Sequence, residues 1–354
     1  MKKDKLHFNF RRVDSFNKVF NFVISEREAG KSTAVIMKAY RAFKKKHKTT
    51  LIIKRLIADI TETYIVDFGK VINKFQPKDK QVELEFKKGS IKEGVVDVFI
   101  AGKHFIRIIA LSNPMSRFKS TMIKDPAMVI FDEFICNNRA GEKYIENEAF
   151  KFKEIYNTYQ RECRGILKCY FLGNPYSLYN PYFSDLNVDT LQLRPGAFIV
   201  GPNYVISCYR IKEELRQAIL KRNPLYQFDE AYKRYAFDGL AVNDSNFIIN
   251  PVRPEKFYLR YTFRLNNKYL TIWSNNSEDS YWQDCKYYIE CAEPVNQSRK
   301  MFAIDFNNLV ANTNLITPTV RILFGRLKQA IAMRNIVFNN IEAGYLTEEL
   351  YTAI

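Results

Sequence analysis

The sequence predicts an α/β protein with a central, mostly parallel sheet, followed by a smaller α+β domain. Two buried apolar runs carry polar residues at their carboxyl ends: 20–24 precedes a loop that closes with Gly30-Lys31-Ser32, and 127–131 precedes Asp132-Glu133. Segments with apolar residues at helical spacing alternate with these runs, which is typical of a parallel sheet with crossover helices. Beyond about residue 245 apolar and polar residues alternate, which favours antiparallel strands.

Composition narrows the classes of partner. The chain has 354 residues, room for two domains, and 47% of them are hydrophobic. Its net charge of +17 points to a polyanionic partner, nucleic acid first and an anionic membrane surface second. No apolar run approaches the roughly 20 residues of a membrane span, so we expect no membrane insertion.

The six cysteines form no Cys-x-x-Cys pair, and only three histidines are present to join them. This pattern argues against a zinc site or a disulfide framework and favours reduced thiols in the cytosol. The N-terminus lacks the apolar core and cleavage site of a signal peptide.

Residues 20–33 have the order strand, loop, Gly-Lys-Ser and helix of a phosphate-binding P-loop. Loop N–H groups and the helix N-terminus attract phosphates, Lys31 can reach the β- and γ-phosphates of ATP, and Ser32 can bind Mg²⁺. The first position of the pattern is Ser25 instead of Gly, and two acids lie in the loop; an ordinary strand-to-helix turn is the alternative. The residues predicted to bind ATP are Ser25, Glu26, Arg27, Glu28, Ala29, Gly30, Lys31, Ser32 and Thr33.

The next elements continue the α/β pattern. A helix after Gly30 is expected to run to about Lys46, and 50–55 is a second buried strand that ends in basic residues, facing nucleotide, DNA or solvent. A helix over 58–75, a strand over 81–86 and a hairpin of 95–100 with 104–111 follow. The residues proposed to contact nucleic acid are Lys54, Arg55, Arg117 and Lys119.

Asp132-Glu133 follows four apolar residues, which is the Walker B pattern about 100 residues after the P-loop. Asp132 is expected to hold Mg²⁺ with Ser32, and Glu133 to polarise the attacking water as general base. The strand 166–172 ends in Gly173-Asn174-Pro175, so Asn174 is a candidate sensor of the γ-phosphate, although the same residues also signal a turn.

The remaining expected elements complete two domains and a linker. A P-loop domain over 1–203, a helical linker over 204–245 and a C-terminal domain over 246–354 are predicted. The expected helices are 148–159, 211–222, 227–237, 317–333 and 347–353, and the expected strands are 197–200, 205–209, 257–265, 269–273, 285–290, 301–306 and 336–338.

Ser25 to Ser32, Ile130 to Phe134 and Leu172 to Pro175 together resemble the DNA-packaging ATPases of tailed phages, and most of all the short ATPases of phi-29-like podophages. That family belongs to the additional-strand, catalytic-glutamate (ASCE) group of P-loop motors. The resemblance implies an ATPase that drives double-stranded DNA into a procapsid. It also implies a homo-pentameric ring at the portal vertex, in the host cytoplasm and absent from the mature virion.

The resemblance also implies an arginine supplied by the neighbouring subunit. Arg161 and Arg164 are the candidates by position, with Arg139 a weaker one; all three can instead form surface ion pairs.

The C-terminal domain resembles an RNase H-like nuclease that has lost its active site. Asp305 is its one well-placed acid, with Glu290 and Glu293 as companions for a metal pair. We expect no cleavage, but binding of DNA, portal or a structural packaging RNA, helped by abundant Lys and Arg.

Other function classes remain open at this stage. A helicase or another DNA-translocating ring ATPase, a nuclease with an ancillary P-loop, and a nucleotide-binding module without turnover all fit the basic charge. Glu133 argues against mere binding, because a binding module needs no catalytic base, and the sparse C-terminal acids argue against a nuclease.

Overall fold

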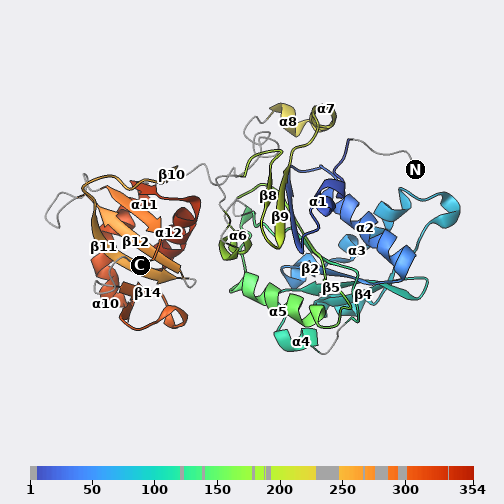
Figure 1. Ribbon diagram of the computed structural model, residues 1–354, viewed down its shortest axis with the longest axis horizontal. Helices are drawn as coiled ribbons and strands as arrows, with labels where there is room; N and C mark the ends of the chain where they lie inside the picture. Colours follow the sequence, from blue (N-terminus) through green and yellow to red (C-terminus); the bar gives the residue numbers. More distant parts are fainter. Residues whose placement is uncertain are drawn as a thin grey trace. The chain divides into compact units, whose positions relative to one another are not determined.

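The chain divides into two compact units, Met1–Asn243 and Asp244–Ile354 (Figure 1). The computed structural model describes residues 6–119, 123–137, 140–177, 180–186, 188, 193–228, 247–265, 268–275, 286–293, 301–333 and 335–354.

The N-terminal unit is built on a nine-stranded sheet of order β3-β4-β5-β2-β6-β7-β1-β9-β8. The six strands from β5 to β9 in this order are parallel, and antiparallel strands close both edges. Its strands are β1 (Phe20–Ser25), β2 (Thr50–Lys54), β3 (Glu85–Phe86), β4 (Val95–Ile100), β5 (Lys103–Ala110), β6 (Val129–Asp132), β7 (Cys169–Gly173), β8 (Phe198–Val200) and β9 (Tyr204–Tyr209).

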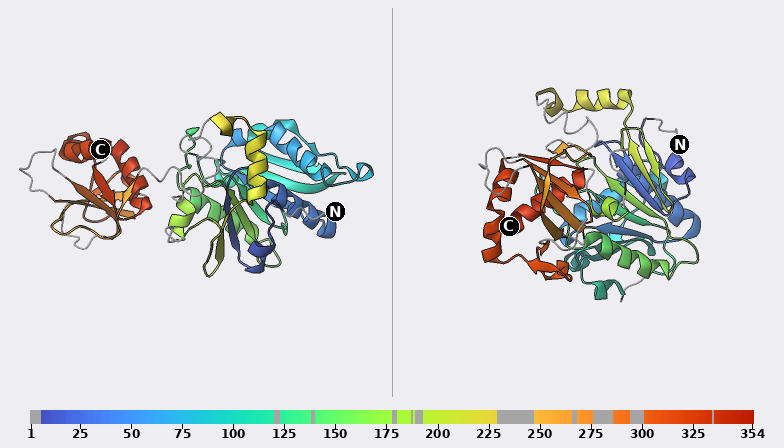
Figure 2. Two further views of the ribbon diagram at one scale, coloured as in Figure 1. Left: turned by 90° about the horizontal axis from the view of Figure 1, so that it is seen from above. Right: turned by 60° about the vertical axis from the view of Figure 1, so that its left-hand side comes forward.

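Helices cover both faces of this sheet (Figures 1 and 2). On one face α2 and α3 pack their apolar sides on the strands, and on the other face α4 and α5 do so. Two buried clusters result, which is why the central strands are apolar on both sides. The helices are α1 (Arg11–Ser15), α2 (Lys31–Lys46), α3 (Glu62–Asn73), α4 (Met115–Lys119), α5 (Glu148–Gln160), α6 (Pro181–Asp185), α7 (Glu213–Arg222) and α8 (Leu225–Phe228).

The first compact unit ends later in the chain than the predicted boundary at residue 203. Strand β9 pairs with β1 along its whole length, from Phe20↔Tyr204 to Ser25↔Tyr209. The segment expected to open a linker at residue 204 is therefore part of the sheet, and the compact unit extends to Asn243. The predicted helix 227–237 and boundary 241–245 lie mostly outside the described residues.

The C-terminal unit holds a seven-stranded sheet of order β10-β16-β13-β12-β11-β14-β15. Strands β11, β12 and β13 are joined antiparallel, whereas β14 and β15 add in parallel beside β11. Its strands are β10 (Ile248–Ile249), β11 (Tyr258–Leu265), β12 (Lys268–Ser274), β13 (Tyr287–Cys291), β14 (Met301–Ala303), β15 (Thr313–Leu315) and β16 (Ile336–Phe338).

Helices α10 (Pro318–Arg321), α11 (Gly325–Ala332) and α12 (Ile341–Ala353) complete this unit, and α11 and α12 contribute to its apolar core. Helix α12 begins six residues before the predicted start, because the Asn340 side chain caps it by accepting from the Ala343 N–H at 2.8 Å.

The net charge of the C-terminal unit differs from the expectation of a basic domain. Residues 244–354 contain 12 Lys and Arg against 11 Asp and Glu, a net charge of +1. Almost all of the chain's net positive charge, +16 of +17, therefore belongs to the N-terminal unit.

No helix of the described residues has both the length and the apolar character needed to cross a membrane.

Candidate functional site

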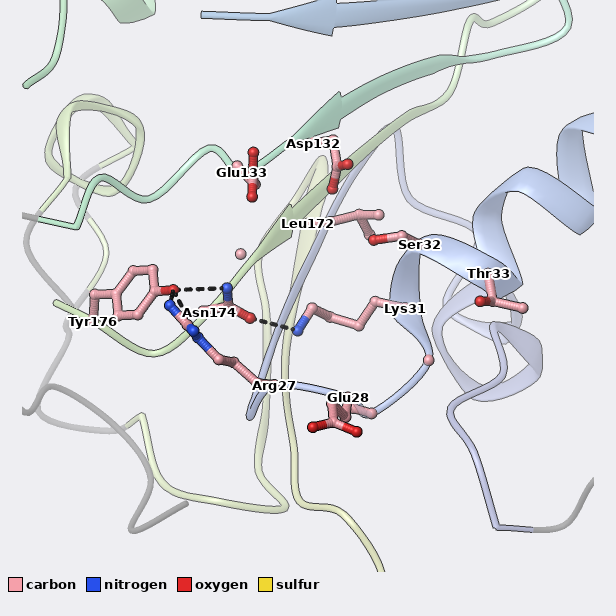
Figure 3. Close-up of a pocket in the computed structure, with 13 residues that line it drawn as sticks. Arg27, Glu28, Lys31, Ser32, Thr33, Asp132, Glu133, Leu172, Asn174 and Tyr176 are labelled. Atoms are coloured by element: carbon pink, nitrogen blue, oxygen red, sulfur yellow. Dashed lines mark hydrogen bonds between the residues drawn. The ribbon is translucent and has the colours of Figure 1, made fainter. Parts of the chain in front are cut away.

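The loop between β1 and α2 has the geometry that the Gly-Lys-Ser pattern predicts. Gly30 precedes α2 with φ of 88°, a left-handed conformation that favours glycine, and an added Cβ would lie 3.1 Å from the His7 side chain. The first N–H groups of α2 thus open on a pocket of about 480 Å³. The pocket is lined by Arg27, Glu28, Ala29, Gly30, Lys31, Ser32, Thr33, Asp132, Glu133, Leu172, Gly173, Asn174 and Tyr176 (Figure 3).

Lys31 lies at the centre of the hydrogen-bond network of this pocket. Its Nζ donates to the Ser25 carbonyl and hydroxyl, both at 2.9 Å, to the Glu26 carbonyl at 3.2 Å and to Asn174 Oδ1 at 3.1 Å. Burial lowers the pKa of Lys31 to about 8, since desolvation disfavours the charged ammonium. Ser25, the departure from the consensus glycine, therefore has a role as a hydrogen-bond partner of this lysine.

The two acids at the carboxyl end of β6, Asp132 and Glu133, lie close to Lys54, the last residue of the neighbouring strand β2. Lys54 Nζ lies 2.8 Å from Glu133 Oε2 and 4.0 Å from Asp132 Oδ2. Burial raises the pKa of Asp132, to which the Tyr64 hydroxyl donates a hydrogen bond. Burial opposes ionisation of Glu133 too, but the Lys54 ammonium outweighs it and lowers the Glu133 pKa.

Asn174, at the end of β7, links the loop to a tyrosine that sequence reasoning missed. Its Nδ2 donates to the Tyr176 hydroxyl at 3.1 Å, and Arg27 donates to the same oxygen through Nη2 at 2.8 Å (Figure 3). Tyr176 and Tyr64 are aromatic residues in an aromatic-rich chain, and no spacing marks them as site residues.

The two acids of the P-loop are engaged by the segment around α7. The buried carboxylate of Glu26 accepts from the Ile211 N–H at 3.2 Å, and Glu28 pairs with Arg222. Ala29 packs among apolar residues of the same segment, such as Leu215. These contacts explain how a loop with two carboxylates keeps its N–H groups available to an anion.

The donor set of the pocket fits a nucleoside triphosphate with Mg²⁺. The buried ammonium of Lys31 and the helix N-terminus supply positive potential for phosphates. Ser32 and Asp132 lie on the same side of the pocket in Figure 3, and Mg²⁺ is commonly held by one or two carboxylates together with substrate phosphates.

The structure overturns two of the predicted nucleic-acid contacts. The side chains of Lys54 and Arg55 are 5% and 7% exposed and are engaged with acids of the same unit, so they have no surface to offer to DNA phosphates. Arg117 is exposed and donates to the Glu93 carbonyl, and Lys119 is the last residue of α4.

The candidate arginines for a neighbouring site are placed differently from the pocket residues. Arg161 and Arg164 are exposed at and after the C-terminal end of α5, and neither lines the pocket of its own chain as far as the structure describes it. Arg139 lies outside the described residues.

The candidate acids of the C-terminal unit do not form a cluster. Asp305 follows β14 and accepts from the Asn308 N–H at 2.9 Å, while Glu290 of β13 accepts from Trp273 Nε1 at 2.7 Å. Strands β12 and β11 separate β13 from β14, so Glu290 is no companion for Asp305. Glu293 is exposed beyond the end of β13.

A parallel sheet in which an interior strand leads through a Gly-Lys-Ser loop into a helix, with acids at the end of a nearby strand, is the arrangement of the P-loop proteins. The fold and the site place the chain in this structural class. Its whole length, residues 1–354, matches the family described as Podovirus DNA encapsidation protein (Gp16), and the chain belongs to that family.

Individual relatives agree with this assignment. The chain is 29% identical over 183 residues to the DNA packaging protein of Bacillus phage phi29, which is 52% of this chain and 51% of that protein. It is 30% identical over 169 residues to the DNA packaging protein of Bacillus phage B103, 48% of each chain. The chain thus spans about half the length of the curated relatives it matches.

Among solved structures, a chain of the bacteriophage Phi-29 viral genome packaging motor assembly superposes with a TM-score of 0.71 over 99% of both chains, at 22% identity. A chain of the Phi-28 gp11 DNA packaging motor superposes with a TM-score of 0.62 over 98% of this chain and 97% of that chain, at 16% identity. Both likenesses show that the fold is shared across the two units.

Proposed function

We propose that this protein is an ATP-hydrolysing motor that moves double-stranded DNA into a phage procapsid. The observation that carries the proposal is the convergence of Lys31, Asp132-Glu133 and Asn174 on one pocket, in a chain whose whole length matches a DNA encapsidation family. The charge of +17 supports a polyanionic substrate.

In this proposal the pocket residues divide the work of hydrolysis. Lys31 and the N-terminus of α2 bind the β- and γ-phosphates, and Ser32 and Asp132 hold Mg²⁺, which supplies charge neutralisation on the phosphates when bound. Glu133 orients and deprotonates the attacking water. The Lys54 ammonium 2.8 Å away favours the ionised carboxylate of Glu133, which is the form that can accept a proton.

The strand order supports membership of the ASCE group. Strand β7 lies between the P-loop strand β1 and the acid-bearing strand β6, which makes it the additional strand. The same insertion brings Asn174, the residue after β7, beside Lys31 at 3.1 Å, where the amide can respond to the γ-phosphate.

We further propose that the protein works as a homo-oligomer, a pentameric ring at the portal vertex of the procapsid in the host cytoplasm, in which Arg161 or Arg164 reaches the neighbour's pocket. The exposure of both arginines beyond the pocket supports this role. An arginine supplied in trans contributes roughly 10³–10⁵ to the rate where it is known.

Mixed rings test the arginine in trans. Glu133→Gln subunits lack the base but keep the arginine, and Arg161→Ala subunits lack the arginine but keep the base, so a mixture should regain ATPase activity that neither variant has alone. The Arg164→Ala mixture is the matched comparison. If neither arginine change lowers ring ATPase activity, the assignment of the arginine is wrong.

For the C-terminal unit we propose an RNase H-like fold without nuclease activity. The order β13-β12-β11-β14-β15, three antiparallel strands followed by two parallel additions, supports this fold. The unit then serves for binding, with portal, DNA or a structural packaging RNA as partners.

The function is tested by ATPase activity of the purified protein with linear DNA, with and without portal-bearing procapsids. We expect DNA-stimulated hydrolysis that increases further with procapsids and is accompanied by protection of DNA from added nuclease. Hydrolysis that responds to DNA but not to procapsids would instead indicate a helicase or another translocase.

A further inference from the structure

The Arg55 guanidinium, buried at the carboxyl end of β2, joins three parts of the N-terminal unit. Its Nε and Nη2 donate to the two carboxylate oxygens of Glu148, at 2.8 and 3.2 Å. Nη1 and Nη2 also donate to the carbonyls of Glu133 and Phe134, at 3.1 and 2.8 Å. Arg55 therefore contacts the backbone of the candidate base and not its carboxylate.

Glu148, the first residue of α5, is built to hold this arginine. Its side chain is 0% exposed. Besides Arg55, its carboxylate accepts from the Tyr182 hydroxyl and from the Ile145 N–H, both at 3.0 Å. A buried charge that is fully paired in this way tolerates no loss of its partner, since the remaining group would stay buried without compensation.

The backbone that Arg55 contacts is in an unfavourable conformation. Glu133 has φ of 61°, a left-handed value that is uncommon for a residue with a side chain. This turn directly after β6 lets the Glu133 side chain line the pocket (Figure 3), while the next side chain, Phe134, is buried in the core. Strained conformations of this kind persist where surrounding contacts hold them.

We infer that Arg55 and Glu148 are positioning residues for the base. The guanidinium ties the Glu133 and Phe134 carbonyls to helix α5 and thereby keeps the left-handed turn that directs the Glu133 carboxylate into the pocket. This role rests on the proposed function of Glu133. It is independent of nucleotide binding, because the P-loop is built from β1 and α2.

Arg55→Lys is the informative variant, because lysine keeps the charge but lacks the fork that bridges a carboxylate and two carbonyls. We expect the single-turnover rate of ATP hydrolysis to fall roughly 10- to 100-fold, the scale of a misplacement near 1 Å. The dissociation constant for ADP, measured by calorimetry, should change less than about twofold. An unchanged hydrolysis rate would overturn the inference.

Arg107→Lys is the matched control. Arg107 forms the same kind of two-pronged pair with Asp97, at 2.6 Å for both bonds, on strands β5 and β4 of the same sheet and outside the pocket. Both variants should lower the melting temperature, but only Arg55→Lys should slow hydrolysis. Equal slowing in the two variants would show a merely structural role and would contradict the proposal.

Two further variants separate the possible failures. Tyr182→Phe removes one hydrogen bond to Glu148 and leaves Arg55 intact, so it should fold and slow hydrolysis about threefold; no slowing in it counts against the inference even if Arg55→Lys does not fold. Glu133→Gln reports on the proposed function itself. If Glu133→Gln remains active, the base assignment fails and the positioning role with it. If it is inactive while Arg55→Lys is not impaired, only the positioning role fails.

Discussion

In the N-terminal unit, polar side chains at the carboxyl ends of the neighbouring strands β6 and β7, and in the loop after β1, line one pocket. In the C-terminal unit, Glu290 lies in β13 and Asp305 follows β14, and these two strands are three places apart in the sheet. With neighbouring strands about 4.8 Å apart, β13 and β14 lie about 14 Å apart in the sheet. A two-metal site needs carboxylates around ions about 4 Å apart. The difference teaches that strand-end acids become a site only where the strand order makes them neighbours.

The two units also differ in net charge. The C-terminal unit has a net charge of +1, so +16 of the total of +17 lies before it. A polyanionic substrate is therefore expected to be attracted mainly by the N-terminal unit.

The first prediction compares an acid of the N-terminal pocket with a strand-end acid of the C-terminal unit, and it has the largest expected effect. Glu133→Gln should lower the rate of ATP hydrolysis roughly 10²–10⁴-fold, the usual contribution of a general base. Asp305→Asn, the matched change at a strand end of the C-terminal unit, should leave that rate unchanged. Steady-state phosphate release measures both, and equal effects would break the comparison.

The second prediction concerns DNA binding. Arg117→Ala and Lys119→Ala, on α4 of the N-terminal unit, should each weaken binding to any duplex sequence and reduce the slope of log K against log salt by about 1. Arg321→Ala, an exposed change in the C-terminal unit, should not alter the slope. Fluorescence anisotropy of labelled DNA at several salt concentrations measures the slope. A reduced slope in Arg321→Ala alone would place the DNA site in the C-terminal unit.

The third and smallest prediction concerns stability. Arg107 and His104 hold the pKa of Asp97 well below its usual range against the opposing effect of burial. Because the folded-state pKa is depressed, this pair stabilises the fold above the ordinary carboxyl pKa of about 4 and loses that contribution as pH falls further. Asp97→Asn should cost about 1 kcal/mol at pH 7. The cost should begin to decline only below about pH 4, and it should vanish as the pH falls through the depressed folded-state pKa of Asp97.

Urea unfolding can assign this loss to one unit. Both tryptophans of the chain, at 273 and 282, belong to the C-terminal unit. Asp97→Asn should therefore shift the transition seen by circular dichroism but not the one seen by tryptophan fluorescence. Asp67→Asn, which removes an exposed pair with Lys70, is the control and should shift neither. A shift in both probes would show that the two units unfold together.

The amino-acid sequence by itself determined the strand-loop-helix at 20–46, the acid-bearing strand β6 and the strand that ends in Asn174. These are local patterns, since an apolar run followed by Gly-Lys-Ser or Asp-Glu constrains the backbone within a few residues. The confirmed α/β class follows from the same periodicity.

Only the tertiary structure decided which of the marked residues meet and which lie elsewhere. The sequence predicted that Lys54 and Arg55 face nucleotide, DNA or solvent, yet the order of β2 beside β6 buries them against Glu133 and Glu148. The physical reason is that a buried charge is defined by its partner, and these partners lie 79 and 93 residues away along the chain. Strand order, which no local pattern encodes, brings them together.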